Sequence, residues 1–160
     1  MKYLFLDIDG VLNTGRHSNY LVDNGLSETN ADGYLFDPEA VQNLEHIIDA
    51  TDAKIIITST WRFDSDMQAL WHNRNLAGEV IGITPTIQKE KAIGKIKIWY
   101  GHRGMEVEEW LKSNATTPYK YAILDDEDDY LEAQSDHLVL TDQMTGITKE
   151  VADKVISLLD

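Results

Sequence analysis

Short apolar runs that end in polar residues set the pattern of this chain. Three such runs cover residues 3–6, 54–57 and 121–124, and each is rich in Ile, Leu or aromatic side chains. Near-continuous apolar runs of this length are typical of strands that are buried on both faces of a parallel sheet. Residues 138–140 and the weaker run 80–84 predict two further strands.

Helical periodicity separates these strands. Residues 36–49, 104–114 and 148–160 carry apolar side chains at helical spacing, with Asp37 and Thr148 as N-caps and Pro38 in a first turn. Trp71, Trp99 and Trp110 are expected in the core. Strands that alternate with helices predict an α/β domain, with three layers and a mostly parallel sheet.

Residues 13–36 interrupt this alternation. The segment holds three glycines, several Asn and Ser residues and the basic-aromatic stretch 16–20. A loop of this length in a compact domain is typical of a functional flap. With no internal repeat and no linker, residues 1–160 are expected to form one domain.

Composition bounds the function. The 160 residues are 42% hydrophobic and 26% charged, as in soluble globular proteins. No apolar run approaches a membrane span, and no signal peptide is evident, so a cytoplasmic protein is expected. The absence of cysteine excludes disulfides and thiolate chemistry. A net charge of −14 argues against extended nucleic-acid binding, and nothing in the sequence indicates an oligomeric state.

Acidic residues follow two of the predicted strands. Asp7 and Asp9 come after the first, where one carboxylate could attack an electrophile and the other transfer a proton. Asp125 and Asp126 follow the strand at 121–124 and offer hard oxygen ligands suited to Mg²⁺. Because ligands bind at the carboxyl ends of parallel strands, these acids are expected to share one site.

Hydroxyl residues follow the strand at 54–57. Thr58 or Ser59 could hold a phosphoryl oxygen at this edge of the sheet. An anionic substrate also requires a cation, and candidates lie upstream of the third strand.

These motifs together resemble the haloacid dehalogenase (HAD) superfamily. Residues 7–11 (DIDGV) resemble its first motif, Thr58 its second, and Asp125-Asp126 a paired-acid form of its fourth. A closer set is DIDGVLN, STWR at 59–62, Arg103-Gly104, ILDD and GIT at 146–148. It resembles the compact HAD domains of Swiss Army knife RNA repair proteins. The resemblance implies a phosphatase with a Rossmann-like fold and little or no cap.

The resemblance also implies roles for the acids. Asp7 would attack phosphorus to form an aspartyl-phosphate, and Asp9 would protonate the leaving alcohol and then activate water. Mg²⁺ would be held by Asp7, by the main-chain carbonyl of Asp9 and by Asp126, with Asp125 or Asp129 assisting.

The phosphoryl group would be bound by other residues. Thr58 and the amide of Ser59 would contact it, with Ser59 as the rival hydroxyl, and Arg62 is a candidate substrate contact. Arg103 fits the position of the third-motif cation. Lys95 and Lys97 are its rivals.

The sequence thus predicts a Mg²⁺-dependent phosphomonoester hydrolase. Its substrate would be a small-molecule or terminal phosphate monoester, such as a nucleotide or the end of a nucleic acid, with no membrane partner. The alternative is a phosphoacceptor or binding module, of HAD-like or receiver-like fold, without efficient turnover.

Overall fold

A five-stranded parallel sheet forms the centre of the protein. The computed structural model describes the backbone of all 160 residues and every side chain except those of residues 98–100. The strands follow the order β5-β4-β1-β8-β9, and every neighbouring pair is parallel, as the sequence predicts. The strands are β1 (Lys2–Leu6), β4 (Lys54–Ile57), β5 (Val80–Ile83), β8 (Lys120–Asp125) and β9 (Leu138–Leu140).

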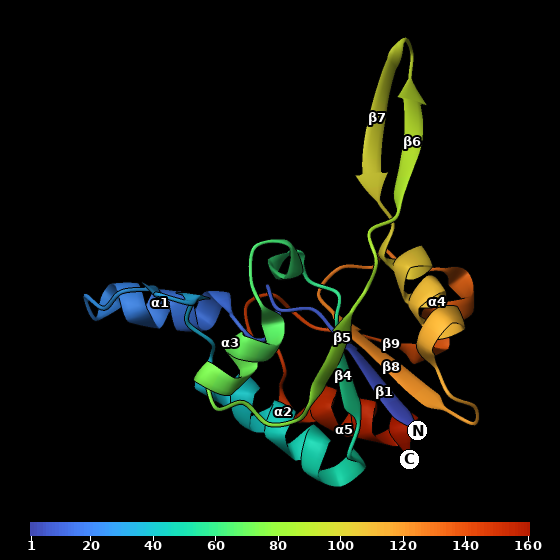
Figure 1. Cartoon of the computed structure of the whole chain (residues 1–160). Helices are drawn as coiled ribbons and strands as arrows, with labels where there is room; N and C mark the ends of the chain where they lie inside the picture. Colours follow the sequence, from blue (N-terminus) through green and yellow to red (C-terminus); the bar gives the residue numbers. More distant parts are fainter.

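Side chains of β1 alternate between two hydrophobic cores. Leu4 and Leu6 belong to the core that includes residues of α2 and α5, whereas Phe5 packs with Trp110 of α4. Helices therefore cover both faces of the sheet, and the fold has the predicted three layers (Figure 1). The helices are α1 (Gly15–Asp23), α2 (Pro38–Thr51), α3 (Met67–Asn73), α4 (Arg103–Asn114) and α5 (Lys149–Leu159), with short 3₁₀ helices η1 (Thr60–Phe63) and η2 (Glu132–His137).

The predicted helix starts are confirmed. The Asp37 carboxylate accepts a hydrogen bond from the Glu39 amide at 2.9 Å, and Pro38 occupies the first turn of α2. Thr148 accepts from the Val151 amide at the start of α5. These side chains satisfy amides that lack partners within the helix.

Two of the three tryptophans expected in the core are buried. Trp71 and Trp110 are 4% and 6% exposed, while the side chain of Trp99 lies outside the part that the structure describes. No helix in the described part of the chain has the length and hydropathy needed to cross a membrane.

Residues 13–36, expected as a loop, contain regular structure. Helix α1 starts at Thr14, whose hydroxyl accepts from the His17 amide, and a short hairpin follows, formed by β2 (Thr29–Asn30) and β3 (Gly33–Tyr34). Leu21 is the one buried residue of α1, so the helix has almost no apolar stripe from which it could be predicted.

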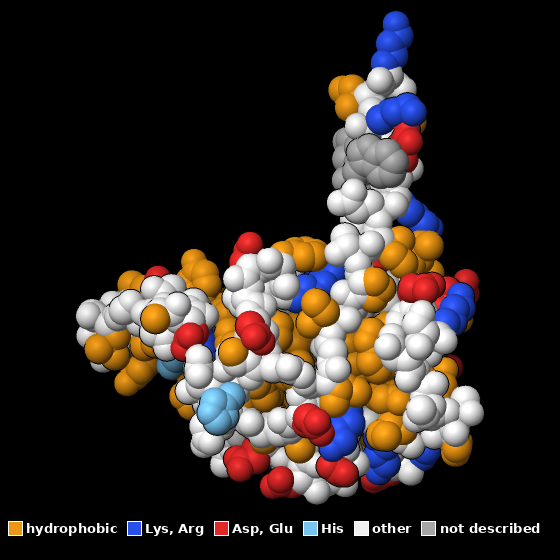
Figure 2. Space-filling view, viewed as in Figure 1, with side chains coloured by type: hydrophobic (Ala, Val, Ile, Leu, Met, Phe, Trp, Pro, Cys, Tyr) orange, Lys and Arg blue, Asp and Glu red, His pale blue; other side chains and the backbone are white. Residues whose placement is uncertain are grey.

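A second hairpin also escaped the sequence analysis. Strands β6 (Gln88–Ile93) and β7 (Ile96–Gly101) pair with each other and extend away from the sheet (Figure 1). Residues 88–97 are all exposed, which is why no alternation of buried and exposed positions marks the hairpin in the sequence. Lysine side chains lie along this hairpin, and acidic side chains are scattered over the body below it (Figure 2).

Candidate active site

Three adjacent strands bring the predicted site residues to one edge of the sheet. Leu6 pairs with Ile57 of β4 on one side and with Leu124 of β8 on the other. The residues that follow them, Asp7, Thr58 and Asp125, therefore lie at the same level. Backbone bonds continue the ladder there: the Asp7 amide donates to the Leu124 carbonyl and the Thr58 amide to the Leu6 carbonyl, both at 3.0 Å.

Acidic oxygens from two of these strand ends gather into a cluster. Carboxylate oxygens of Asp7, Asp125 and Asp126 all lie within 4.8 Å of one another. Both oxygens of Asp125 already accept hydrogen bonds, from the Tyr130 hydroxyl at 2.6 Å and from the Glu127 amide at 2.9 Å. Asp126 is only half-buried. Asp126 is thus the more accessible of the two fourth-motif acids.

Asp129 lies apart from this cluster. Its carboxylate accepts from the Arg103 amide at 3.4 Å, and its carbonyl accepts from the Gly104 amide at 3.0 Å. These contacts hold the first turn of α4 in place.

Arg103 is the cation that faces the carboxylates. Its guanidinium lies 3.2 Å from Asp7 Oδ2 and also pairs with Asp125. The rival lysines lie on the β6–β7 hairpin, where both are exposed and Lys97 pairs with Glu90 at 2.6 Å. The start of α4 therefore delivers the cation to the site.

The site holds more negative charge than Arg103 balances. Burial raises the pKa of Asp7 to about 7, and the charge of Asp125 adds to the rise while Arg103 opposes it. Burial and Asp125 also raise the pKa of Asp126. Although burial lowers the pKa of Arg103, the facing carboxylates of Asp7 and Asp125 raise it overall. Three carboxylates facing one guanidinium form a hard-oxygen donor set that fits Mg²⁺.

Two buried polar atoms at this edge have no partner among the described side chains and backbone. They are Asp7 Oδ1 and Thr58 Oγ1. Ser59 differs, because its hydroxyl accepts from the Trp61 amide at 3.4 Å and caps η1. Buried polar groups are nearly always hydrogen-bonded, so these two atoms mark a place where a ligand would bind. Of the two candidate hydroxyls, Thr58 has the free one.

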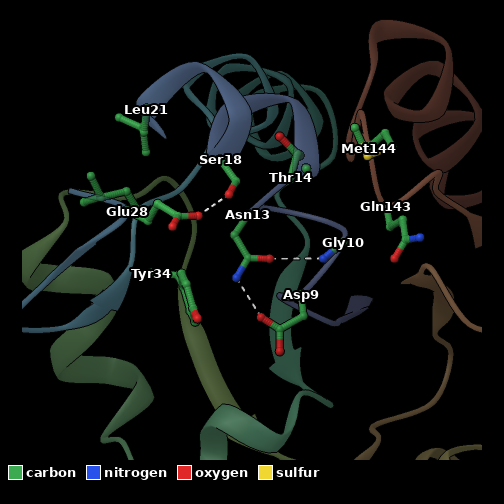
Figure 3. Close-up of a pocket in the computed structure, with 12 residues that line it drawn as sticks. Asp9, Gly10, Asn13, Thr14, Ser18, Leu21, Glu28, Tyr34, Gln143 and Met144 are labelled. Atoms are coloured by element: carbon green, nitrogen blue, oxygen red, sulfur yellow. Dashed lines mark hydrogen bonds between the residues drawn. The ribbon is translucent and has the colours of Figure 1, made fainter. Parts of the chain in front are cut away.

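Asp9 is held by two side-chain donors. Its Oδ1 accepts from Asn13 Nδ2 at 2.6 Å and from Trp61 Nε1 at 3.0 Å. Asn13 Oδ1 in turn accepts from the Gly10 amide (Figure 3). Gly10 has φ +72°, and a Cβ there would collide with the Asp126 carboxylate, so the turn requires glycine. The exposed Asp9 carboxylate is thereby fixed at the mouth of the site.

Arg62 is buried beneath the site. Its guanidinium pairs with Glu106 at 3.0 Å and donates to the carbonyls of Thr58 and Ser59, at 3.0 Å for Ser59. Only 4% of its side chain is exposed. Arg62 therefore braces the backbone that carries Thr58; its two terminal nitrogens make these contacts, and its Nε has no partner among the described residues.

Three contributors were missed by the sequence analysis. Asn13 orients Asp9, Tyr130 holds Asp125, and Glu106 pairs with Arg62. Glu106 lies three residues after Arg103, so a helical projection places both on one face of α4. Asn13 ends the DIDGVLN stretch, but nothing in the sequence indicates that it orients Asp9, and Tyr130 follows its motif in an irregular segment.

Comparison with known proteins shows the family of this chain. A family model described as "HAD domain in Swiss Army Knife RNA repair proteins" matches residues 3–152. No curated protein and no solved structure gives a significant match.

Proposed function

Because the chain belongs to the family of HAD domains in Swiss Army Knife RNA repair proteins, a hydrolase family of the HAD type, we propose that it is a Mg²⁺-dependent phosphomonoester hydrolase. One observation carries the proposal. Asp7 Oδ1 and Thr58 Oγ1 are buried without partners among the described residues, at the sheet edge that also carries the acidic cluster and Arg103. A phosphoryl group would supply an acceptor for the Thr58 hydroxyl and an electrophile for Asp7.

In the first step an oxygen of Asp7 attacks phosphorus. The bond between phosphorus and the ester oxygen breaks, and an aspartyl-phosphate forms. Asp9, held by Asn13 and Trp61, donates a proton to the departing alkoxide, so that the product leaves as a neutral alcohol. Thr58 donates to a phosphoryl oxygen throughout, and Arg103 lowers the repulsion between Asp7 and the anionic group.

In the second step water cleaves the acyl phosphate. The Asp9 carboxylate, deprotonated by the first step, accepts a proton from the attacking water. Inorganic phosphate leaves, and Asp7 is regenerated as a carboxylate. Two acids separated by one residue thus perform nucleophilic and proton-transfer chemistry in turn.

Mg²⁺ would be held by carboxylate oxygens of Asp7 and Asp126, assisted by Asp125, and by the main-chain carbonyl of Asp9. Bound there, the ion would neutralise charge on the phosphoryl oxygens and on the clustered acids. The acidic cluster within 4.8 Å supports this ligand set.

The substrate class follows from the open site. Among the described residues, α1 and the β2–β3 and β6–β7 hairpins extend from the sheet without a separate cap domain, and we propose that the enzyme acts on small-molecule phosphate monoesters, such as nucleotides, or on terminal phosphates. We place residues 13–36 as a flap or minimal cap over the site.

Release of phosphate from p-nitrophenyl phosphate tests the proposal. The wild-type protein should hydrolyse p-nitrophenyl phosphate in the presence of Mg²⁺. The activity should be lost in EDTA and should return when Mg²⁺ is restored. Asp7→Asn should abolish turnover, while Asp136→Asn, an exposed acid in η2, should retain it. Absence of turnover, together with no uptake of beryllofluoride at Asp7, would refute the proposal. A phosphorylated Asp7 that persists for minutes would instead support the phosphoacceptor alternative.

A further inference from the structure

A cavity of about 410 Å³ lies beside Asp9, and its size is that of a small-ligand pocket. Helix α1 forms one wall, residues around the β2–β3 hairpin form another, and the loop after β9 forms the third (Figure 3). Asp9, Gly10 and Asn13 line the end nearest the proposed phosphoryl site. An ester with its phosphorus near Asp7 and its ester oxygen near Asp9 would extend its alcohol portion into this cavity.

The lining combines apolar and neutral polar groups with two acids. Leu21, Tyr34 and Met144 supply apolar surface. The charged residues of the lining are Asp9 and Glu28, and Glu28 accepts a hydrogen bond from Ser18. The Glu28 carboxylate therefore lines the cavity next to the Ser18 side chain (Figure 3).

A second pocket also includes Asp9 and Tyr34 in its lining and extends along residues 31–33 of the β2–β3 hairpin. Its further charged residues are again acids, Asp32, Asp64 and Asp66. Neither lining includes a lysine or arginine among the residues that the structure describes there. The nearby Arg16 is engaged by Asp37 at 2.8 Å and by Glu39 at 2.9 Å. The charged side chains that line either pocket are therefore all acids.

We propose that the enzyme selects phosphate monoesters whose alcohol portion is compact and carries no negative charge, and that Glu28 contributes to this selection. The proposal rests on the hydrolase activity proposed above. A hydroxyl or amine on the alcohol portion would donate a hydrogen bond to the Glu28 carboxylate, and its apolar part would contact Tyr34. A second phosphate or a carboxylate would approach the Glu28 carboxylate, and the described lining of this cavity supplies no lysine or arginine to offset its charge. Esters of neutral alcohols are therefore favoured over bisphosphates and over the ends of nucleic-acid strands.

Three aryl phosphates of matched shape test the selection. They carry at the para position a methyl, a carboxymethyl or an aminomethyl group, and the methylene keeps the leaving phenol similar in all three. We expect kcat/KM for the anionic ester to be lower than for the neutral one by about tenfold, as repulsion across roughly 7 Å predicts. The cationic ester should match or exceed the neutral one. A 5′-phosphorylated dinucleotide should have a kcat/KM as low as that of the anionic ester.

Glu28→Gln keeps an acceptor for Ser18 and removes the charge. In this variant, kcat/KM for the neutral ester divided by kcat/KM for the anionic ester should be roughly threefold lower than in the wild type. Asp23→Asn, which removes an exposed charge at the end of α1 outside the cavity, should leave the ratio unchanged. Raising the salt concentration should bring the wild-type kcat/KM values for the neutral and anionic esters closer together, because salt screens the repulsion. This test does not depend on the folding of any variant.

The outcomes separate the two proposals. If none of the three esters is hydrolysed in Mg²⁺, the proposed function fails. If all three are hydrolysed at equal rates, or the anionic ester is preferred, the hydrolase stands and the proposed selection is overturned. If the ratio of kcat/KM for the neutral and anionic esters is the same in Glu28→Gln as in the wild type, while the wild-type ratio depends on salt, Glu28 does not contribute to the selection.

Discussion

Thr58 and Ser59 are adjacent hydroxyl residues with different positions in the structure. Thr58 is buried with an unpartnered hydroxyl, whereas Ser59 uses its hydroxyl to cap η1. The chain sequence ITST offers no means of choosing between them. The choice depends on which side chain the end of β4 turns toward Asp7.

Thr58→Val keeps the shape of the side chain and removes the hydroxyl. We expect kcat/KM for p-nitrophenyl phosphate to fall roughly a hundredfold, since one hydrogen-bond donor to the transition state is lost. The free energy of unfolding should not fall, because no described hydrogen bond is broken. Kinetic assays and urea unfolding measure both quantities.

Ser59→Ala is the matched comparison. It removes the cap of η1 and should cost about 1 kcal/mol of stability, with activity within severalfold of wild type. A larger loss of activity in Ser59→Ala than in Thr58→Val would reverse the assignment.

The sequence identified most acids of the site but could not assign its supporting residues. Asp7, Asp125 and Asp126 follow apolar strands, so their clustering was predictable from parallel topology. The choice of Arg103 over Lys95 and Lys97 could not be predicted, because all three residues precede β8 and the hairpin that carries the lysines has no apolar pattern. Long-range contacts decide such choices, and periodicity does not record them.

At the scale of elements, predictability follows burial. Strands β1, β4 and β8 and helices α2 and α5 bury apolar stripes, and each was found from its pattern. Helix α1 buries one residue, and residues 88–97 of the β6–β7 hairpin bury none. Elements that contribute little to the core leave little trace in a single sequence.

The side chain of Asp37 forms hydrogen bonds at the start of α1 and at the start of α2. Its carboxylate caps α2 and also accepts from the Thr14 hydroxyl at 2.6 Å and from Arg16 at 2.8 Å. Asp37→Ala should lower the free energy of unfolding by about 2 kcal/mol, since a cap and a buried acceptor are lost together. Urea unfolding measures the loss, and Asp49→Ala, an exposed residue of α2, is the control. Equal stability of the two variants would contradict the assigned role.

The β6–β7 hairpin should be dispensable for folding. Its strands pair with each other, and none of its described side chains is buried in either core. Replacing residues 88–101 with a short Gly-Ser linker keeps Ile87 and His102, whose backbones close the base. We expect Tm to change by less than about 3 °C, equivalent to about 1 kcal/mol for a chain of this size. Thermal unfolding followed by circular dichroism checks this, and a drop of 10 °C would show that the hairpin packs on the body.

At the scale of the whole molecule, excess negative charge is concentrated at the site as well as on the surface. The chain carries a net charge of −14, and three carboxylates meet at the carboxyl edge of the sheet. The fold therefore holds acids together that would repel one another in the absence of a cation. The proposed binding of Mg²⁺ would therefore be coupled to stability through this edge.

This coupling predicts how stability depends on pH. Burial raises the pKa of Asp7 to about 7, well above the 3.8 of an unperturbed aspartate. Between these two values the folded state binds more protons than the unfolded state, so stability falls as pH rises. In EDTA, the free energy of unfolding should therefore decrease from pH 4.5 to pH 7.5, in the direction expected for a buried acid whose ionisation is disfavoured. Asp7→Asn should flatten this decrease.

Mg²⁺ should oppose that loss at neutral pH. Saturating Mg²⁺ at pH 7.5 should raise Tm by about 5 °C, because a ligand that binds only the folded state stabilises it by mass action. Asp126→Asn should at least halve the rise, whereas Asp136→Asn, outside the cluster, should retain it. NaCl at equal ionic strength separates specific binding from general screening. If NaCl reproduces the whole rise, the carboxylates at this edge are stabilised by diffuse counterions, and the proposed metal ligands are wrong.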